Sequence, residues 1–135
     1  MNRIIGRLSL IFFATISSCM QQSIEQFSYY DGSGNAYMIH EGHFKYEPVT
    51  PESSSSGIYS GGEAVSRNIS EVELSTVKRL FEGAVSAVDQ HQDDRAMMTG
   101  LVVLARGSDT TRVVLKPGSS KKAELENFLM KLKGN

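Results

Sequence analysis

Residues 70–88 read SEVELSTVKRLFEGAVSAV, and this stretch gives the firmest secondary-structure prediction in the sequence. Ser70 and Glu73 form a capping-box sequence, in which the serine hydroxyl accepts from the glutamate amide and the carboxylate reaches back to the serine amide. Apolar residues then recur at steps of three and four, as on one face of an amphipathic helix: Leu74, Val77, Phe81, Ala84, Val85 and Val88. The pattern predicts a helix that begins after Ser70 and ends near Val88.

Downstream of this helix the sequence indicates a hairpin and a second helix. Two β-prone runs, residues 97–106 and 111–116, flank Gly107-Ser108-Asp109-Thr110, which is typical of a β-hairpin. Pro117-Gly118 ends the second strand, and Ser119 or Ser120 can cap a helix that stops at Gly134. The apolar stripe of this helix consists of Leu125, Phe128, Leu129 and Leu132.

Upstream, residues 37–47 are aromatic and β-prone and predict one strand bounded by Pro48. Strict alternation would place Phe44 and Tyr46 on one face with Met38 and His40, unless Gly42 forms a bulge. Residues 63–69 return as a short strand. The expected fold is therefore α+β in the order β-β-α-β-β-α, an antiparallel sheet with two helices packed on one face.

The N-terminus has the pattern of a secretory signal. Arg3 and Arg7 precede an apolar run, residues 8–16, that is long enough for a signal peptide and too short to span a bilayer. The following Ile16-Ser17-Ser18-Cys19 resembles the bacterial lipobox. The resemblance implies that residues 1–18 are a lipoprotein signal peptide and that Cys19, the only cysteine, is lipidated. Met20 follows it instead of an inner-membrane retention aspartate, which favours the outer membrane of a bacterial cell envelope.

Behind Cys19 we expect a lipidated, flexible tether at 19–35 and a single α+β domain at 36–135. The 135-residue chain has 14 basic and 15 acidic residues, and loss of the two signal arginines leaves 12 against 15. This balance excludes the broad basic surface of a nucleic-acid binder. A lone cysteine excludes a disulfide framework and a multi-cysteine zinc site.

The sequence contains no recognisable catalytic arrangement. There is no G-x-S-x-G nucleophile turn, and Gly61-Gly62 lacks the lysine of a phosphate-binding loop. His40 and His43 are three apart, but on a continuous strand they point to opposite faces. We therefore expect neither catalytic residues nor a metal site nor a cofactor, and we expect that the protein is not an enzyme.

Tyrosine, serine and glycine gather in the first half of the domain and its preceding segment. All five tyrosines lie between residues 29 and 59, next to a connection, 48–62, with four consecutive serines. Such a composition is typical of binding surfaces. It predicts a non-catalytic, lipid-anchored envelope module whose protein or envelope ligand contacts Tyr46, Ile58, Tyr59, Ser60, Gly61 and Gly62. Two alternatives stay open: Tyr46 can be a half-buried strand residue, and the loop can be inert. The oligomeric state also stays open.

One further resemblance concerns element order. Ser60-Gly61-Gly62 with Ala64 and Arg67, then a helix, a hairpin and a leucine-rich last helix, is similar to emfourin, a small bacterial inhibitor of thermolysin-like metalloproteases. The resemblance implies protease inhibition in the envelope as an alternative function. The strand at 37–47 and the lipobox depart from that family.

Overall fold

A computed structural model describes residues 24–134; the predicted signal peptide and Cys19 lie outside this range. The described chain forms one seven-stranded sheet in the order β4-β3-β2-β1-β6-β7-β5, in which all neighbours are antiparallel. The strands are β1 (Glu25–Tyr30), β2 (Ala36–His40), β3 (His43–Glu47), β4 (Val65–Asn68), β5 (His91–Gln92), β6 (Gly100–Arg106) and β7 (Asp109–Leu115). The helices are α1 (Glu71–Ser86), the 3-10 turn η1 (Val88–Gln90) and α2 (Ser120–Lys133).

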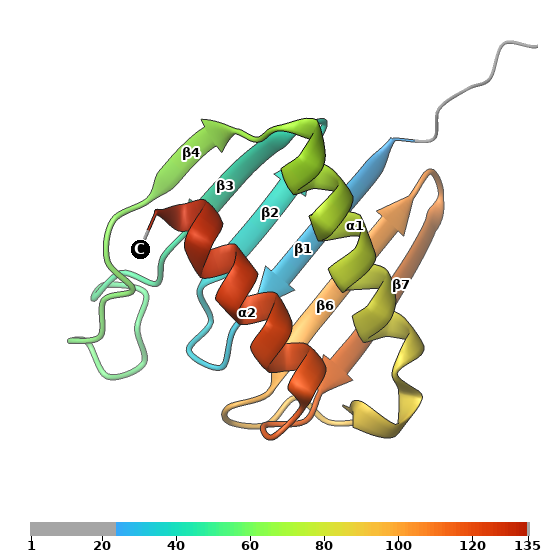
Figure 1. Ribbon diagram of the computed structural model, residues 1–135. Helices are drawn as coiled ribbons and strands as arrows, with labels where there is room; N and C mark the ends of the chain where they lie inside the picture. Colours follow the sequence, from blue (N-terminus) through green and yellow to red (C-terminus); the bar gives the residue numbers. More distant parts are fainter. Residues whose placement is uncertain (1–23, 135) are drawn as a thin grey trace, which may run out of the picture.

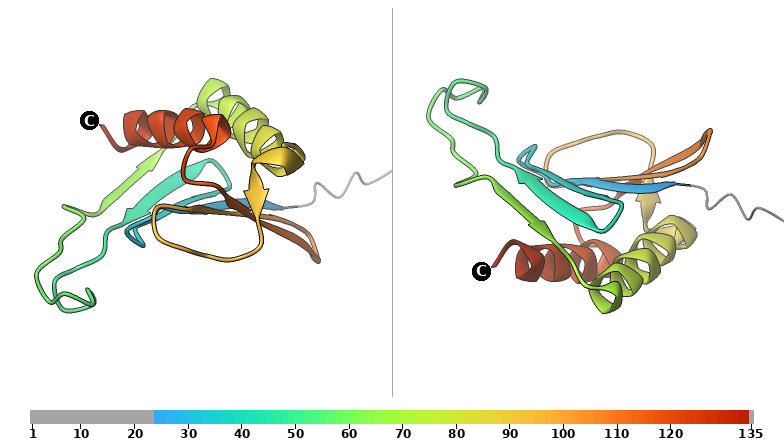
Figure 2. Two further views of the ribbon diagram at one scale, coloured as in Figure 1. Left: turned by 90° about the horizontal axis from the view of Figure 1, so that it is seen from below. Right: turned by 90° about the horizontal axis from the view of Figure 1, so that it is seen from above.

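Helices α1 and α2 lie next to each other and on the same side of the sheet (Figures 1 and 2). Between sheet and helices is the core, in which Phe27 of β1 meets Phe81 of α1 edge to face with ring centroids 5.3 Å apart. Among the described residues, no helix is long and apolar enough to cross a membrane. The α+β class, the antiparallel sheet and the two helices are confirmed.

Both predicted helices form as their capping residues indicate. The Ser70 hydroxyl accepts from the Glu73 amide, and the Glu73 carboxylate accepts from the Ser70 amide, so the capping box is complete. The Ser119 hydroxyl caps α2 by accepting from the Lys122 amide, without a reciprocal side-chain bond. Gly134 ends α2 in the left-handed conformation, at φ 98°.

The expected element order is wrong because it omits the central strand. Residues 25–30, assigned above to a flexible tether, form β1, which pairs with β2 on one side and β6 on the other. Phe27 and Tyr29 alternate with Gln26 and Ser28, so each apolar ring enters the core between polar neighbours. The domain therefore begins before Ala36.

The single strand expected at 37–47 is a hairpin of β2 and β3. Glu41 and Gly42 both have positive φ, 48° and 74°, which is the geometry of a tight two-residue turn and not of a bulge. The turn shifts the alternation, so Tyr37 and Ile39, rather than Met38 and His40, share the buried face with Phe44 and Tyr46. His40 pairs directly with His43 across the hairpin, on the face opposite the helices.

The two ends of the sheet differ in character. At the end where β1 begins, which we call the anchor end because β1 follows the predicted lipidation site in the sequence, Glu25 bonds Lys78 of α1 and Arg106 of β6, each at 2.9 Å. The hydrogen bond from Lys78 lowers the pKa of Glu25 despite its burial. At the opposite end, which we call the loop end, lie three connections, residues 31–35, 48–64 and 93–99 (Figure 1).

Candidate functional site

The loop end is held together by Asn35, which is 4% exposed. Its side-chain oxygen accepts from the Val49 amide at 2.9 Å, and its side-chain nitrogen donates to Asp31 at 2.8 Å and to the Tyr59 hydroxyl at 3.0 Å. One buried amide thus joins the turn 31–35 to both arms of the loop 48–64, and its hydrogen bonds offset the cost of burying it.

The base of the 48–64 loop is closed by two further hydrogen bonds. The Gly61 amide donates to the Val49 carbonyl at 2.8 Å, and the Tyr46 hydroxyl donates to the Gly61 carbonyl at 2.7 Å. A Cβ at position 61 would overlap the Asn35 amide, so this close approach requires glycine. The loop is therefore fixed where it leaves the sheet.

The six binding residues predicted from the sequence divide between this base and the surface. Tyr46 is 1% exposed and lies in the core against Tyr37, so it is a structural residue and not a contact residue. Gly61 belongs to the closed base. The other four reach the surface, with Ile58 83% and Tyr59 38% exposed and Ser60 and Gly62 also exposed.

The third connection, residues 93–99, brings two exposed methionines to the loop end. Met97 and Met98 are 87% and 68% exposed. The sequence placed Met97 at the start of a strand, but β6 begins at Gly100, since Met98 has φ 62° and cannot continue a strand. In the sequence, these exposed side chains are marked only by the two consecutive methionines and the Thr99-Gly100 that follow them.

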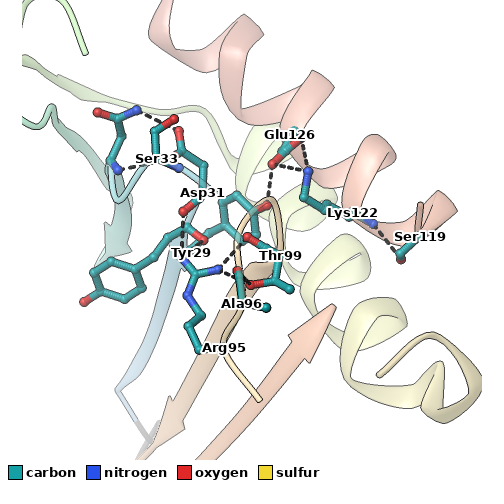
Figure 3. A network of polar contacts seen from close by, with 11 residues as sticks. Tyr29, Asp31, Ser33, Arg95, Ala96, Thr99, Ser119, Lys122 and Glu126 are labelled. Atoms are coloured by element: carbon teal, nitrogen blue, oxygen red, sulfur yellow. Dashed lines mark hydrogen bonds and ion pairs between the residues drawn. The ribbon is translucent and has the colours of Figure 1, made fainter. Parts of the chain in front are cut away.

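Arg95 fixes this connection against the end of β1. Its guanidinium donates to the carbonyls of Thr99, Tyr30 and Asp31 and to the Thr99 hydroxyl (Figure 3). A Cβ on Gly32 would lie 2.8 Å from the Met98 Cα, so glycine is needed for the two loops to touch.

A pocket of about 380 Å³ opens between these loops and α2. Its walls are residues 31–33, Met97 and Met98 from the loops and Lys122, Glu126 and Met130 from the helix, with Tyr37 also lining it. We call it the methionine pocket. It combines apolar thioethers with three charged side chains, so it suits a small or side-chain-sized group.

Beside this pocket, the buried Tyr29 hydroxyl donates to the Glu126 carboxylate at 2.5 Å (Figure 3). Glu126 also pairs with Lys122 at 3.0 Å. Burial, and next the hydrogen bond to Glu126, raise the pKa of Tyr29 well above its ordinary value of 10.0. Tyr29 therefore keeps its proton and acts as a hydrogen-bond donor that positions α2 over β1.

His43 has the contacts of a general base but not the surroundings of one. Its Nε2 lies 2.7 Å from the Ser66 hydroxyl and its Nδ1 lies 3.0 Å from the Asn68 side-chain oxygen. All three side chains are exposed cross-strand neighbours on the open face of the sheet. An oxyanion formed there would be solvated by water, whereas a catalytic site stabilises it with fixed hydrogen-bond donors. We interpret the contacts as stabilising the pairing of β3 with β4.

In residues 24–134, no group of three His, Cys, Asp or Glu side chains is placed to hold a metal ion. Comparisons with protein-family models, curated proteins and solved structures find no match to this chain.

Proposed function

We propose that the chain is a lipid-anchored binding module of the bacterial cell envelope, without catalytic activity, that holds a protein ligand at its loop end. The observation that carries the proposal is the distribution of exposed apolar side chains. The described residues include eight large apolar residues that are exposed. Five of these belong to the loop end and its pocket: Ile58, Tyr59, Met97, Met98 and Met130. Apolar groups gathered in this way favour a contact surface.

The position of the anchor supports the same proposal. A lipid on Cys19 would connect to Glu25 through a segment that spans at most about 20 Å when extended. The anchor end would then stay near the membrane, and the loop end, at the opposite end of the sheet, would face away from it. A partner in the envelope space could reach the loops without displacing the anchor.

The anchoring part of the proposal is tested by Cys19→Ala in the full-length protein, with Ser18→Ala as the matched control. The Cys19 variant should leave the membrane fraction and remain unprocessed, because the thioether-linked acyl chains are lost. The Ser18 variant should sediment with membranes like the wild type. Normal cleavage and membrane association of Cys19→Ala would contradict lipidation.

The binding part is tested by capture of partners on tagged full-length protein solubilised from its own membranes. Ile58→Ser and Tyr59→Ala should each reduce capture of the bound partner about tenfold, as expected for contact residues worth 1–2 kcal/mol. Val72→Ser is the control, because Val72 is 76% exposed but lies on α1. Unchanged capture with both loop variants would contradict a contact at the loop end.

Protease inhibition is the alternative, in which residues 48–64 enter a protease cleft as a wedge. The loop extends away from the sheet (Figure 1) and carries Ile58, which is 83% exposed. Under this alternative the captured partner is a metalloprotease. The wild-type protein should slow its peptide hydrolysis, and the Ile58→Ser variant should not. A captured partner without protease activity favours the general binding module.

A further inference from the structure

Methionine has an unusual distribution in this fold. Residues 24–134 contain four methionines, Met38, Met97, Met98 and Met130, and none of them belongs to the buried core. The core is built from Phe, Tyr, Ile, Leu, Val and Ala. Three of the four methionines line the methionine pocket, and they come from two elements far apart in sequence. Packing of the core therefore does not account for these thioethers.

The backbone that presents these methionines is fixed on both sides of the pocket. On one side, Arg95 and the close contact with Gly32 hold Met97 and Met98 against the end of β1. Met98 is one of two non-glycine residues in the described chain with positive φ, a conformation that costs energy and is retained only where the surroundings impose it. On the other side, Met130 is part of α2, which Tyr29 and Glu126 tie to the sheet. The parts of these residues that remain flexible are the unbranched methionine side chains.

The two carboxylates that line the pocket, those of Asp31 and Glu126, already have hydrogen-bond or ion-pair partners. The Asp31 carboxylate accepts from the amides of Ser33 and Asn35 and from the Asn35 side chain, at 2.8–2.9 Å. The Glu126 carboxylate is bound to Tyr29 and Lys122. Hard cations such as Ca²⁺ and Mg²⁺ require several such oxygens. Besides the Ser33 and Tyr37 hydroxyls, the pocket offers three neutral thioethers from methionines that are 87%, 68% and 44% exposed, and thioethers select soft cations.

We propose that Met97, Met98 and Met130 bind one soft monovalent cation, Cu(I), in the methionine pocket. Thioethers carry no proton to lose, so binding has the same affinity across neutral pH, unlike binding by histidine or cysteine. The proposal does not rest on the protein-binding function above, since it concerns the sulfur atoms and not the apolar surface.

The test is a competition titration of full-length protein in detergent with Cu(I), under anaerobic conditions against a chromogenic Cu(I) chelator. We expect one Cu(I) per protein and equal affinity at pH 6 and pH 8. Each of Met97→Leu, Met98→Leu and Met130→Leu should weaken binding by about tenfold or more, because each removes a ligand. Met38→Leu, on the open face of the sheet, is the matched control and should bind Cu(I) like the wild type.

A second measurement identifies the ligands directly. In protein labelled with ¹³C at the methionine methyl groups, Ag(I), an air-stable analogue of Cu(I), should shift the signals of Met97, Met98 and Met130 and leave that of Met38 in place. Leucine preserves the volume and apolar character of methionine, so the leucine variants should still capture a protein partner. A wild-type protein that binds Cu(I) but captures no partner would therefore fault the proposed function and leave the metal site standing.

Three results would overturn the metal site. One is failure of the wild type to compete with the chelator. Another is undiminished Cu(I) binding by the triple leucine variant, which would mean that groups other than these three thioethers bind Cu(I). The last is an equal loss in Met38→Leu, or Ag(I) shifts confined to methionines outside the pocket.

Discussion

Tyr29 occupies the space that a side chain at position 100 would need. A Cβ on Gly100 would overlap the Tyr29 hydroxyl, which donates to Glu126. Tyr29 itself is fully buried and stands on the central strand. A glycine at the start of β6 thus allows a tyrosine on β1 to reach α2, and this one contact connects both sheet halves to the helix beside the methionine pocket.

Gly100→Ala should therefore destabilise the protein. Overpacking of a well-packed site costs about 1–3 kcal/mol, and displacement of the hydroxyl adds the loss of a charged hydrogen bond. Gly118→Ala is the control, because a Cβ there meets no atom within 4 Å. Urea unfolding of both variants measures the difference, and equal stability would show that Tyr29 is not confined by position 100.

Helix α1 contacts the core through Phe81. This ring is fully buried and packs edge to face on Phe27 of β1. Phe81→Ala should lower the free energy of unfolding by about 3–5 kcal/mol, through lost burial and the cavity that remains. Val72→Ala on the exposed face of α1 should change it by less than about 0.5 kcal/mol. A melting temperature of Phe81→Ala near that of the wild type would contradict this packing.

The helices could be predicted from the sequence because their signals are local. Ser70 with Glu73, and Ser119 with Gly134, mark helix ends within a few residues, and the apolar steps of three and four lie inside the same segment. Strand β1 carries no comparable signal. Its burial depends on pairing with β6, more than 70 residues away, and its composition of Gln, Ser and Tyr resembles that of a linker.

The same distinction applies to the candidate site. Serine and glycine content marks the 48–64 loop, and the structure places Ile58 and Tyr59 on the surface there. Tyr46 and Gly61 close the base of this loop next to Asn35. Asn35 is held by hydrogen bonds with Val49 and Tyr59, which are 14 and 24 residues away in the sequence. The methionine pocket joins residues of three segments, so no local pattern could have predicted it.

Three buried tyrosines make the free energy of unfolding of the whole protein sensitive to alkaline pH. Burial is the largest cause that raises the pKa of Tyr29, Tyr37 and Tyr46, each from an ordinary value of 10.0. The folded state therefore keeps protons that the unfolded state releases above about pH 10. The stabilisation is complete below that pH and is lost as the pH rises further.

Each of these tyrosines loses its proton on unfolding above pH 10. Each should therefore lower the free energy of unfolding by up to about 1.4 kcal/mol per pH unit above pH 10. Urea unfolding at pH 9, 10 and 11 measures the decline, and phenolate absorbance should rise for these residues only with unfolding. Tyr37→Phe removes one contribution and should give a shallower decline than the wild type. Identical slopes in the two proteins would contradict the assignment to buried tyrosines.

We propose that the loop end, turned away from the anchor end, contacts a partner. Site-specific photo-crosslinking in living cells detects this contact, with a photoreactive residue placed at Ile58, at Met97 or, as the control, at Ser108 in the anchor-end turn between β6 and β7. Positions 58 and 97 should crosslink to the same protein, and position 108 should not. Crosslinks to that protein from position 108 alone, or none from 58 and 97, would contradict it.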